Sequence, residues 1–381
     1  MNYLMQIVHG GVLYVGVFLI VLTVLVFVHE LGHYLIARHN GVKIEVFSIG
    51  FGPELFGWWD RSGTRWKFSA IPLGGYVKMF GDSDASSGLP AADAAEMTPA
   101  EREVSFHCKR LGQRAAIVAG GPFANFVFAI VMLALLFMTY GQPFTPAQVG
   151  QVVAGSAAAN GGIKSGDDIV SINGRTVDRF EDVQQIVRLN PNVAMDMVVR
   201  RDDALVNLSV TPAQVEETDR FGTHQIGQLG IRGGTPKYVR RNPASAVVRA
   251  VGETWNLCAT TLQAMWQMVI GTRGTDELGG PLRIAQLSGE VAQGGIVPLL
   301  WFMSVLSVNL GLINLFPVPV LDGGHLLFYA AEAVRGKPLG QRAQEYGFRV
   351  GLALVLTLMV FATWNDLMRT GIVDIVKRFV T

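Results

Sequence analysis

The chain has 381 residues, of which 50% are hydrophobic and only 16% are charged. A soluble protein has about 25% charged residues, so this composition indicates a membrane protein. The formal net charge of +1 gives no sign of the basic surface that nucleic-acid binding requires. The two cysteines, Cys108 and Cys258, have the spacing of neither a metal site nor a disulfide framework.

Four stretches are apolar enough to form membrane-spanning helices, which need about 20 mostly apolar residues. We expect these helices at 11–37, 115–140, 296–316 and 350–364. The first lacks the positive n-region and the cleavage site of a signal peptide, so we interpret it as a permanent span. The moderately apolar stretch 253–271 has polar interruptions, which favours an amphipathic helix lying on the membrane over a fifth span.

Lysine and arginine residues predict the orientation, because they gather in cytoplasmic loops. They are concentrated in the loop between the first two expected spans and in the loop between the last two. Both loops are therefore expected in the cytoplasm, with segment 141–295 on the opposite side. Residues 83–100 are small, polar and Pro-containing, which is typical of a flexible loop.

Residues 141–220 have a soluble character, because short β-type runs alternate there with Gly, Asn and Asp turns. Residues 179–190 place apolar side chains at helical spacing, which predicts a short amphipathic helix. We expect a compact α+β domain over 141–220. A linker with interfacial helices is expected over 221–295, between helical membrane domains at 1–140 and 296–381.

An H-E-x-x-H motif, formed by His29, Glu30 and His33, lies inside the first expected span. On a helix the two histidines share one face and can bind one metal ion, and the glutamate is near enough to act as a base toward water. Ionisable residues are costly at membrane depth and are usually functional there. The motif therefore predicts a catalytic zinc site, which needs a third protein ligand.

The candidate third ligand lies in NLFPVPVLDGGH, residues 314–325. Its prolines interrupt a helix, and irregular backbone at membrane depth is tolerated only where it is buried or lines a polar cavity. We favour Asp322 as the ligand over His325, three residues further on. The alternative role for Asp322 is that of an N-cap for a helix beginning at Gly323.

The H-E-x-x-H motif, together with N-x-x-P-x-P-x-L-D-G at 314–323, resembles the site-2 protease family of intramembrane zinc metalloproteases. Further sequences resemble its bacterial regulator-of-sigma-E protease branch: SIGFGPELF at 48–56, IPLGGYVKMFGD at 71–82, AIVAGGPFANFVFA at 116–129 and LGGPLRIAQLSG at 278–289. Residues 152–177 resemble a PDZ domain. Some family members carry two such domains, whereas this chain has room for one clear copy.

The resemblance implies that His29, His33 and Asp322 bind Zn²⁺, that Glu30 is the catalytic base, and that Asn314 helps to position the substrate. It also implies a membrane-associated β-hairpin at 51–79. It further implies a bacterial inner membrane, so the side opposite the basic loops, which holds the PDZ-like domain, is the periplasm. We expect the active site near the cytoplasmic side, because His29 and His33 lie late in a span that runs inward. The implied partners are transmembrane protein substrates, such as an anti-sigma factor or signal peptide remnants.

The expected fold class is a multi-span α-helical membrane protein with about four transmembrane helices, a β-hairpin and an inserted α+β PDZ-like domain. That domain acts either as a filter that bars bulky substrates, which we favour, or as a receptor for a peptide C-terminus. In the second expected span, Gly120, Gly121 and Ala124 are expected to pack against a neighbouring helix, and the polar Asn125 is a residue that can face the site.

Two other functions compete with proteolysis. A metal-ion transporter using the same ligands needs further polar residues through the spans, and few are present. A catalytically inactive membrane scaffold, with the PDZ-like domain as its active part, is disfavoured by the intact Glu30.

Overall fold

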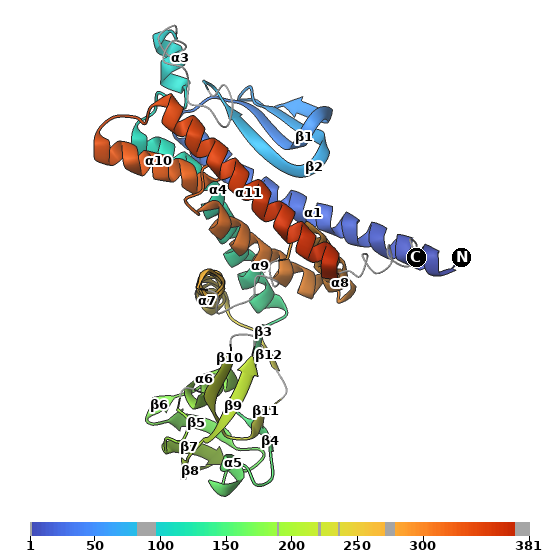
Figure 1. The fold of residues 1–381 in the computed structure, drawn as a ribbon, viewed down its shortest axis with the longest axis vertical. Helices are drawn as coiled ribbons and strands as arrows, with labels where there is room; N and C mark the ends of the chain where they lie inside the picture. The colour runs from blue at the N-terminus through green and yellow to red at the C-terminus, as the bar shows by residue number, and fades with distance from the viewer. Residues whose placement is uncertain are drawn as a thin grey trace. The chain divides into compact units, whose positions relative to one another are not determined.

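The computed structural model describes residues 2–81, 97–188, 190–219, 222–234, 237–270 and 279–369. Most of the predicted flexible loop at 83–100 lies outside these residues. The chain forms two units, seen in Figure 1. We call them the membrane unit (Met1–Ala134, Val247–Leu262 and Asp276–Thr381) and the α+β unit (Leu135–Ala246 and Gln263–Thr275).

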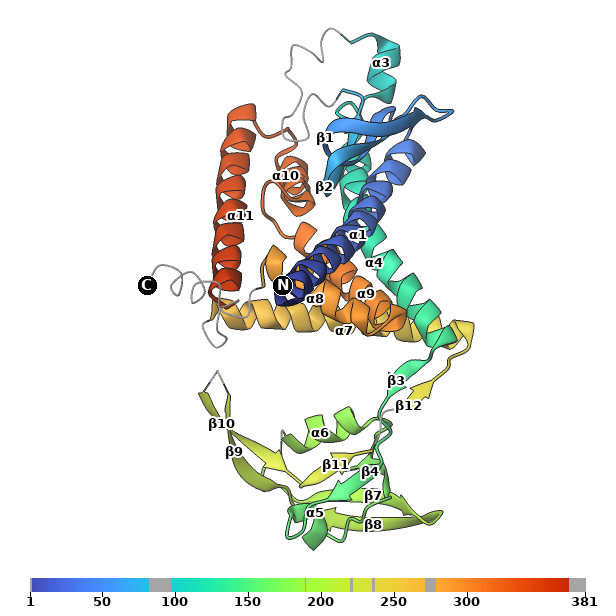
Figure 2. The same ribbon diagram turned by 90° about the vertical axis from the view of Figure 1, so that its right-hand side faces the viewer.

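Long helices make up most of the membrane unit, as Figure 2 shows. The long helices are α1 (Asn2–His39), α4 (Leu111–Thr139), α9 (Ile296–Asn314) and α11 (Gln341–Arg369). The shorter ones are α3 (Pro99–Val104), α8 (Pro281–Gln293) and α10 (Asp322–Arg335), and α7 (Pro243–Val269) belongs partly to each unit.

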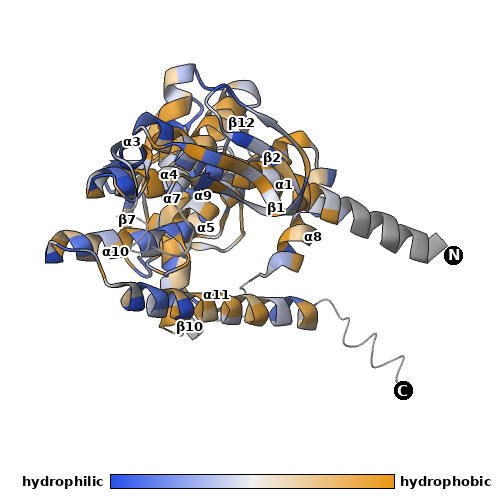
Figure 3. Cartoon of the chain, turned by 90° about the horizontal axis from the view of Figure 1, so that it is seen from above, coloured by the Kyte–Doolittle hydropathy of each residue, from blue (hydrophilic) through white to orange (hydrophobic). Residues whose placement is uncertain are grey.

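Within the described residues, four helices are long and apolar enough to cross a membrane, which agrees with the four predicted spans. They cover Tyr14–His39, Leu111–Thr139, Ile296–Asn314 and Arg342–Met368. The last is longer than the predicted 350–364. Its first turns contain charged residues, so the apolar run begins later than the helix does. Figure 3 shows these hydrophilic residues at the beginning of α11 and apolar residues along the rest. The helix α7, which is fully described, is not one of these four.

A long antiparallel hairpin, β1 (Ile44–Trp59) with β2 (Arg65–Met79), packs against α1. An aromatic cluster holds it there: the Phe47 ring stacks on Trp66 at 4.2 Å between centroids, and Tyr34 of α1 meets Trp66 at 5.1 Å. The Tyr34 hydroxyl also donates to Asp60, which lies after β1, at 2.9 Å. The hairpin is therefore fixed to the helix that carries the H-E-x-x-H motif.

Glycines allow the membrane helices to approach each other closely. A Cβ on Gly120 of α4 would lie 2.8 Å from the carbonyl oxygen of Gly32 in α1. A Cβ on Gly311 of α9 would lie 3.0 Å from the carbonyl oxygen of Pro122 in α4. The predicted close packing of Gly120 is thus confirmed, and α4 lies between α1 and α9.

The α+β unit is built around a four-stranded sheet in the order β6-β5-β7-β8. Its elements are β3 (Gln142–Phe144), β4 (Val149–Val152), α5 (Ala157–Asn160), β5 (Asp168–Ile172), β6 (Arg175–Thr176), α6 (Phe180–Arg188), β7 (Met195–Arg201) and β8 (Ala204–Val210). Helix α6 is the predicted amphipathic helix, and it buries Val183 and Val187 in the core of the unit.

The predicted domain boundary at 220 is wrong. Four more strands follow β8: β9 (Ala213–Asp219), β10 (Gly222–Gln228), β11 (Ile231–Gly233) and β12 (Lys237–Val239). Strand β10 pairs with β9, β11 pairs with β4, and β12 pairs with β3. Strands β10, β11 and β12 therefore belong to the α+β unit instead of a linker. A local sequence pattern misses this, because the partners of β11 and β12 lie far back in the chain.

Candidate metal centre

The two histidines of the H-E-x-x-H motif point the same way from α1, because they lie one helical turn apart. Their Nε2 atoms are 3.3 Å apart, and the rings are nearly perpendicular, at 85°. Both side chains are largely buried, with 12% of their surface exposed. The predicted helical placement of the motif is confirmed.

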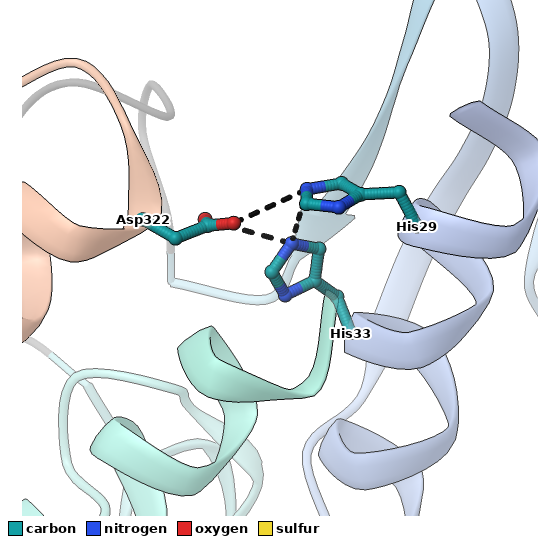
Figure 4. Close-up of side chains that lie close together, drawn as sticks. All are labelled: His29, His33 and Asp322. Carbon is teal, nitrogen blue, oxygen red and sulfur yellow. Dashed lines mark hydrogen bonds and ion pairs between the residues drawn. The ribbon is translucent and has the colours of Figure 1, made fainter. Parts of the chain in front are cut away.

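Asp322 completes the cluster from the beginning of α10 (Figure 4). Its Oδ2 lies 3.2 Å from Nε2 of His29, and its Oδ1 lies 3.6 Å from Nε2 of His33. The preference for Asp322 over His325 agrees with this geometry, since His325 is outside the cluster and its ring packs on Phe328.

An irregular loop after α9 places Asp322 at this point. Val320 has φ of +119°, a strained value for a β-branched residue. A Cβ on Gly324 would lie 2.5 Å from the carbonyl oxygen of Val318, so only glycine fits where the loop crosses the beginning of α10. The N-cap of α10 is Leu321, with no side-chain cap bond, so the alternative role of Asp322 as N-cap is wrong.

The other ring nitrogens of the histidines are held by α4. Nδ1 of His33 lies 2.9 Å from the carbonyl oxygen of Ile117, and Nδ1 of His29 lies 3.0 Å from the side-chain amide of Asn125. A carbonyl oxygen only accepts hydrogen bonds, so Nδ1 of His33 carries the proton and its Nε2 presents a lone pair to the cluster. Such a bond from the second ring nitrogen is typical of metal-ligating histidine.

The donor set fits a zinc ion. Ligand atoms at about 2.0–2.1 Å in a tetrahedral site are about 3.3 Å from one another. Nε2 of His29 lies 3.3 Å from Nε2 of His33 and 3.2 Å from Oδ2 of Asp322, both close to this value. One ligand atom from each of the three residues lies within 4.8 Å of the others. The Oδ2 atom of Asp322 is also buried without a hydrogen-bond partner among the described residues, as expected for an atom that faces a cation.

Glu30 lies beside the cluster rather than in it, since the three donor residues are His29, His33 and Asp322. The backbone N–H of Val77 in β2 donates to its carboxylate. A Cβ on Gly75 would lie 3.1 Å from Cγ of Glu30, so this glycine lets the strand approach the glutamate. The hairpin therefore orients the group that was predicted to be the base.

Asn314, the predicted substrate-positioning residue, ends α9 and is partly exposed. No hydrogen bond of its side chain occurs within the part of the chain that the structure describes. The structure thus does not join Asn314 to the donor cluster, and its role stays a prediction.

Gly121 was predicted to pack against a neighbouring helix, and in the structure it directly faces the two histidine rings of the site. A Cβ at this position would lie 2.8 Å from Cε1 of His29 and would also overlap Nε2 of His33. The missing side chain leaves room for both imidazoles, and lets His33 reach the carbonyl oxygen of Ile117 one turn earlier in α4. Two adjacent glycines in an apolar helix gave only a weak signal of this role.

Comparison with known proteins places the chain in a family. The model of peptidase family M50 matches residues 17–358. The chain belongs to peptidase family M50. The resemblance to the site-2 proteases is thereby confirmed over most of the chain.

Bacterial relatives match nearly the full length of this M50 chain. A candidate zinc metalloprotease of Agrobacterium fabrum is 47% identical over 359 residues, which cover 93% of this chain and 95% of the relative. One from Rhizobium meliloti is 46% identical, with coverage of 92% and 95%. Metalloprotease MmpA of Caulobacter vibrioides is 40% identical, with coverage of 92% and 94%.

Among solved structures, the PDZ domain of an SdrC-like protein from Listeria monocytogenes is 17% identical and covers 24% of this chain and 90% of its own. The TM-score is 0.20, which carries no argument about the α+β unit.

Proposed function

We propose that the chain is a zinc metalloprotease that hydrolyses peptide bonds within transmembrane segments of single-pass membrane proteins. One observation carries the proposal: donor atoms of His29, His33 and Asp322 converge beside Glu30, and the two histidines lie in a helix apolar enough to cross a membrane. Membership of peptidase family M50 supports the same activity.

His29, His33 and Asp322 hold the zinc ion in this proposal. A zinc ion bound there supplies Lewis acidity, which polarises a carbonyl group and acidifies a water molecule. The three residues come from two parts of the chain, so the site assembles only when the loop before α10 packs next to α1. Three protein ligands leave a fourth position open, as a catalytic site requires.

Glu30 acts as the general base and then as the general acid. Its carboxylate takes a proton from the attacking water and delivers it to the leaving amine. The backbone N–H of Val77 in β2 orients this carboxylate beside the donor cluster. A positioned proton-transfer group of this kind contributes about 10²–10⁴-fold to the rate.

The substrate is a transmembrane helix, because the bond to be cut must reach donors carried by a membrane-spanning helix. Its backbone must first unwind, since a helix uses its own amide groups internally. The exposed apolar side chains of the hairpin, including Leu55 at 73% and Trp59 at 65%, suit a surface that contacts lipid or an apolar peptide. Pairing of an unwound substrate with this hairpin, aided by Asn314, is the route we favour.

The cellular context is also part of the proposal. We place the enzyme in a bacterial inner membrane, with the α+β unit as a periplasmic PDZ-like filter and the metal site near the cytoplasmic side. An anti-sigma factor is the favoured substrate, in a cascade of regulated intramembrane proteolysis, with signal peptide remnants as a second class. The basic loops between the first two and last two spans support this orientation.

The test uses the full-length chain in detergent with a panel of single-pass membrane proteins that carry a tag on each side of the membrane. The proposal predicts cleavage inside the transmembrane segment, loss of cleavage with a chelator, and recovery with Zn²⁺. Zinc binding without cleavage of any substrate, in a chain that transports the ion into vesicles, would instead favour the transporter. A chain that neither binds zinc nor cleaves would favour the scaffold.

A further inference from the structure

Asn125 is a fully buried polar residue in α4, at the contact with both α1 and α9. Its backbone oxygen accepts a hydrogen bond from Ser307 of α9 at 2.9 Å. A Cβ on Gly311 would lie 3.2 Å from Cβ of Asn125, so α9 closes over the residue. The side chain cannot swing away, and the freedom left to it is a half-turn of the terminal amide.

That amide faces the second ring nitrogen of His29. Nδ2 of Asn125 lies 3.0 Å from Nδ1 of His29, and the amide oxygen Oδ1 is buried without a hydrogen-bond partner among the described residues. With this orientation the amide donates to Nδ1, and the imidazole proton resides on Nε2. Nε2 then carries an N–H, which it donates to the lone pair of Nε2 of His33, 3.3 Å away, so it has no lone pair for a metal ion.

A half-turn of the amide reverses this assignment. The oxygen then accepts a hydrogen bond from Nδ1–H, and Nε2 of His29 presents its lone pair to the cluster. The two orientations occupy the same space, because the amide oxygen and nitrogen are nearly equal in size. His33 has no such choice, since its partner is the carbonyl oxygen of Ile117, which only accepts.

We infer that Asn125 is a positioning residue that selects the tautomer of His29: its amide donates to Nδ1 in the metal-free chain and accepts from Nδ1 when zinc binds. The inference rests on the proposed zinc site and deepens it. In this inference His29 changes its tautomer when zinc binds, whereas His33 keeps its proton on Nδ1 throughout. The donating orientation of the amide satisfies both ring nitrogens of His29 without a metal ion, because Nδ1 then accepts from Asn125 and Nε2–H donates to Nε2 of His33.

Two substitutions of similar size separate this role from plain packing. Asn125→Asp offers only acceptors, so it holds His29 permanently in the ligating tautomer. Asn125→Leu offers neither donor nor acceptor. The matched control is Ser307→Ala, which removes the neighbouring bond to the backbone of Asn125 and leaves the amide in place.

The measurement is the zinc dissociation constant of the full-length chain in detergent, by competition with a chromophoric chelator, with the thermal unfolding midpoint of each metal-free variant. We expect Asn125→Asp to tighten zinc binding by up to about 10-fold and Asn125→Leu to weaken it by about 10–100-fold. Ser307→Ala should bind zinc as the wild type does. The absorption spectrum of the Co²⁺-loaded chain should keep its tetrahedral form in the aspartate variant.

If Asn125 only fills space, the order of zinc affinities is reversed. Leucine then fills the same volume and preserves binding, whereas the buried carboxylate of Asn125→Asp disturbs the packing and weakens binding. Zinc binding by Asn125→Leu at wild-type affinity, or weaker binding by Asn125→Asp than by the wild type, would overturn the inference. If the leucine variant fails to fold, the comparison of the aspartate variant with the wild type still decides. A wild-type chain that binds no zinc would overturn the proposed function as well, so the two failures are distinguishable.

Discussion

Oδ2 of Asp322 lies 3.2 Å from Nε2 of His29, although the two residues stand near opposite ends of the chain. The ion pair between Arg114 of α4 and Glu332 of α10, at 2.5 Å, holds α10 against α4, the helix that contacts both histidines. The metal site is therefore a tertiary feature, which depends on how α10 and its preceding loop pack.

The first prediction concerns the third ligand. Asp322→Asn should weaken zinc binding by more than about 100-fold, since loss of an outer partner alone costs about 10–100-fold. The matched control is His325→Asn, three residues further on and outside the cluster. Zinc content after dialysis, measured by atomic emission on the full-length chain, checks both. Equal zinc content in the two variants would contradict the assignment.

The second prediction concerns the glycine that faces the imidazoles. Gly121→Ala should reduce zinc binding and proteolysis, because the added methyl group would displace both His29 and His33. Gly112→Ala, near the beginning of the same helix, is the control, since a Cβ there meets nothing within 4 Å. Comparison of the zinc dissociation constants and cleavage rates tests this, and no difference between the two variants would count against it.

The third prediction concerns pH and the α+β unit. Arg201 donates two hydrogen bonds to Asp167, at 2.7 and 2.8 Å, and holds the pKa of that carboxyl below its ordinary value. The pair therefore stabilises the unit above about pH 4, the ordinary pKa of Asp, and loses this effect as the pH falls through the folded-state pKa.

Asp167→Asn should then destabilise the unit by about 1–3 kcal/mol at neutral pH. The difference from the wild type should shrink below about pH 4. Hydrogen exchange of β5 and β7 in the full-length chain, corrected for the intrinsic rate at each pH, measures it. A difference that stays constant as the pH falls would refute the ionic origin.

The fourth prediction concerns the last membrane helix. Asp366 of α11 is buried, and its carboxylate accepts hydrogen bonds from the backbone N–H groups of Gly280 and Arg283, each at 3.0 Å. It thus caps the beginning of α8 from another helix. Asp366→Ala should destabilise the chain by about 1 kcal/mol. Thr363→Ala is the control, since that hydroxyl donates to the carbonyl oxygen of Met359 in its own helix. The measurement is thermal unfolding in detergent, where Asp366→Ala should have a lower midpoint than Thr363→Ala. Equal midpoints for the two variants would show that the cap contributes nothing.

Local patterns predicted the parts of this structure that depend on nearby residues. Spacing of four on a helix places His29 and His33 together, and apolar runs mark the four candidate spans. The prolines and glycines around Asp322 predicted an irregular backbone, because those residues restrict or free the chain whatever surrounds them.

Contacts between segments far apart in the chain could not be predicted from local sequence patterns. The cap that Asp366 forms on α8 depends on the packing of two helices far apart in the chain. Strands β11 and β12 pair with β4 and β3, so the end of the α+β unit lies beyond the predicted boundary. The hydrogen bond of Asn125 to His29 likewise joins two helices, and an asparagine in an apolar span indicates a polar neighbour without naming it.

The most direct test of the account compares the wild-type chain with Glu30→Gln, and measures zinc content and cleavage of a transmembrane substrate on the same preparation. Because Glu30 lies outside the donor cluster, the variant should keep its zinc. Because the amide cannot take a proton from water, its cleavage rate should fall by about 10²–10⁴-fold. Cleavage by Glu30→Gln at the wild-type rate, or a wild-type chain that cleaves without zinc, would contradict the account.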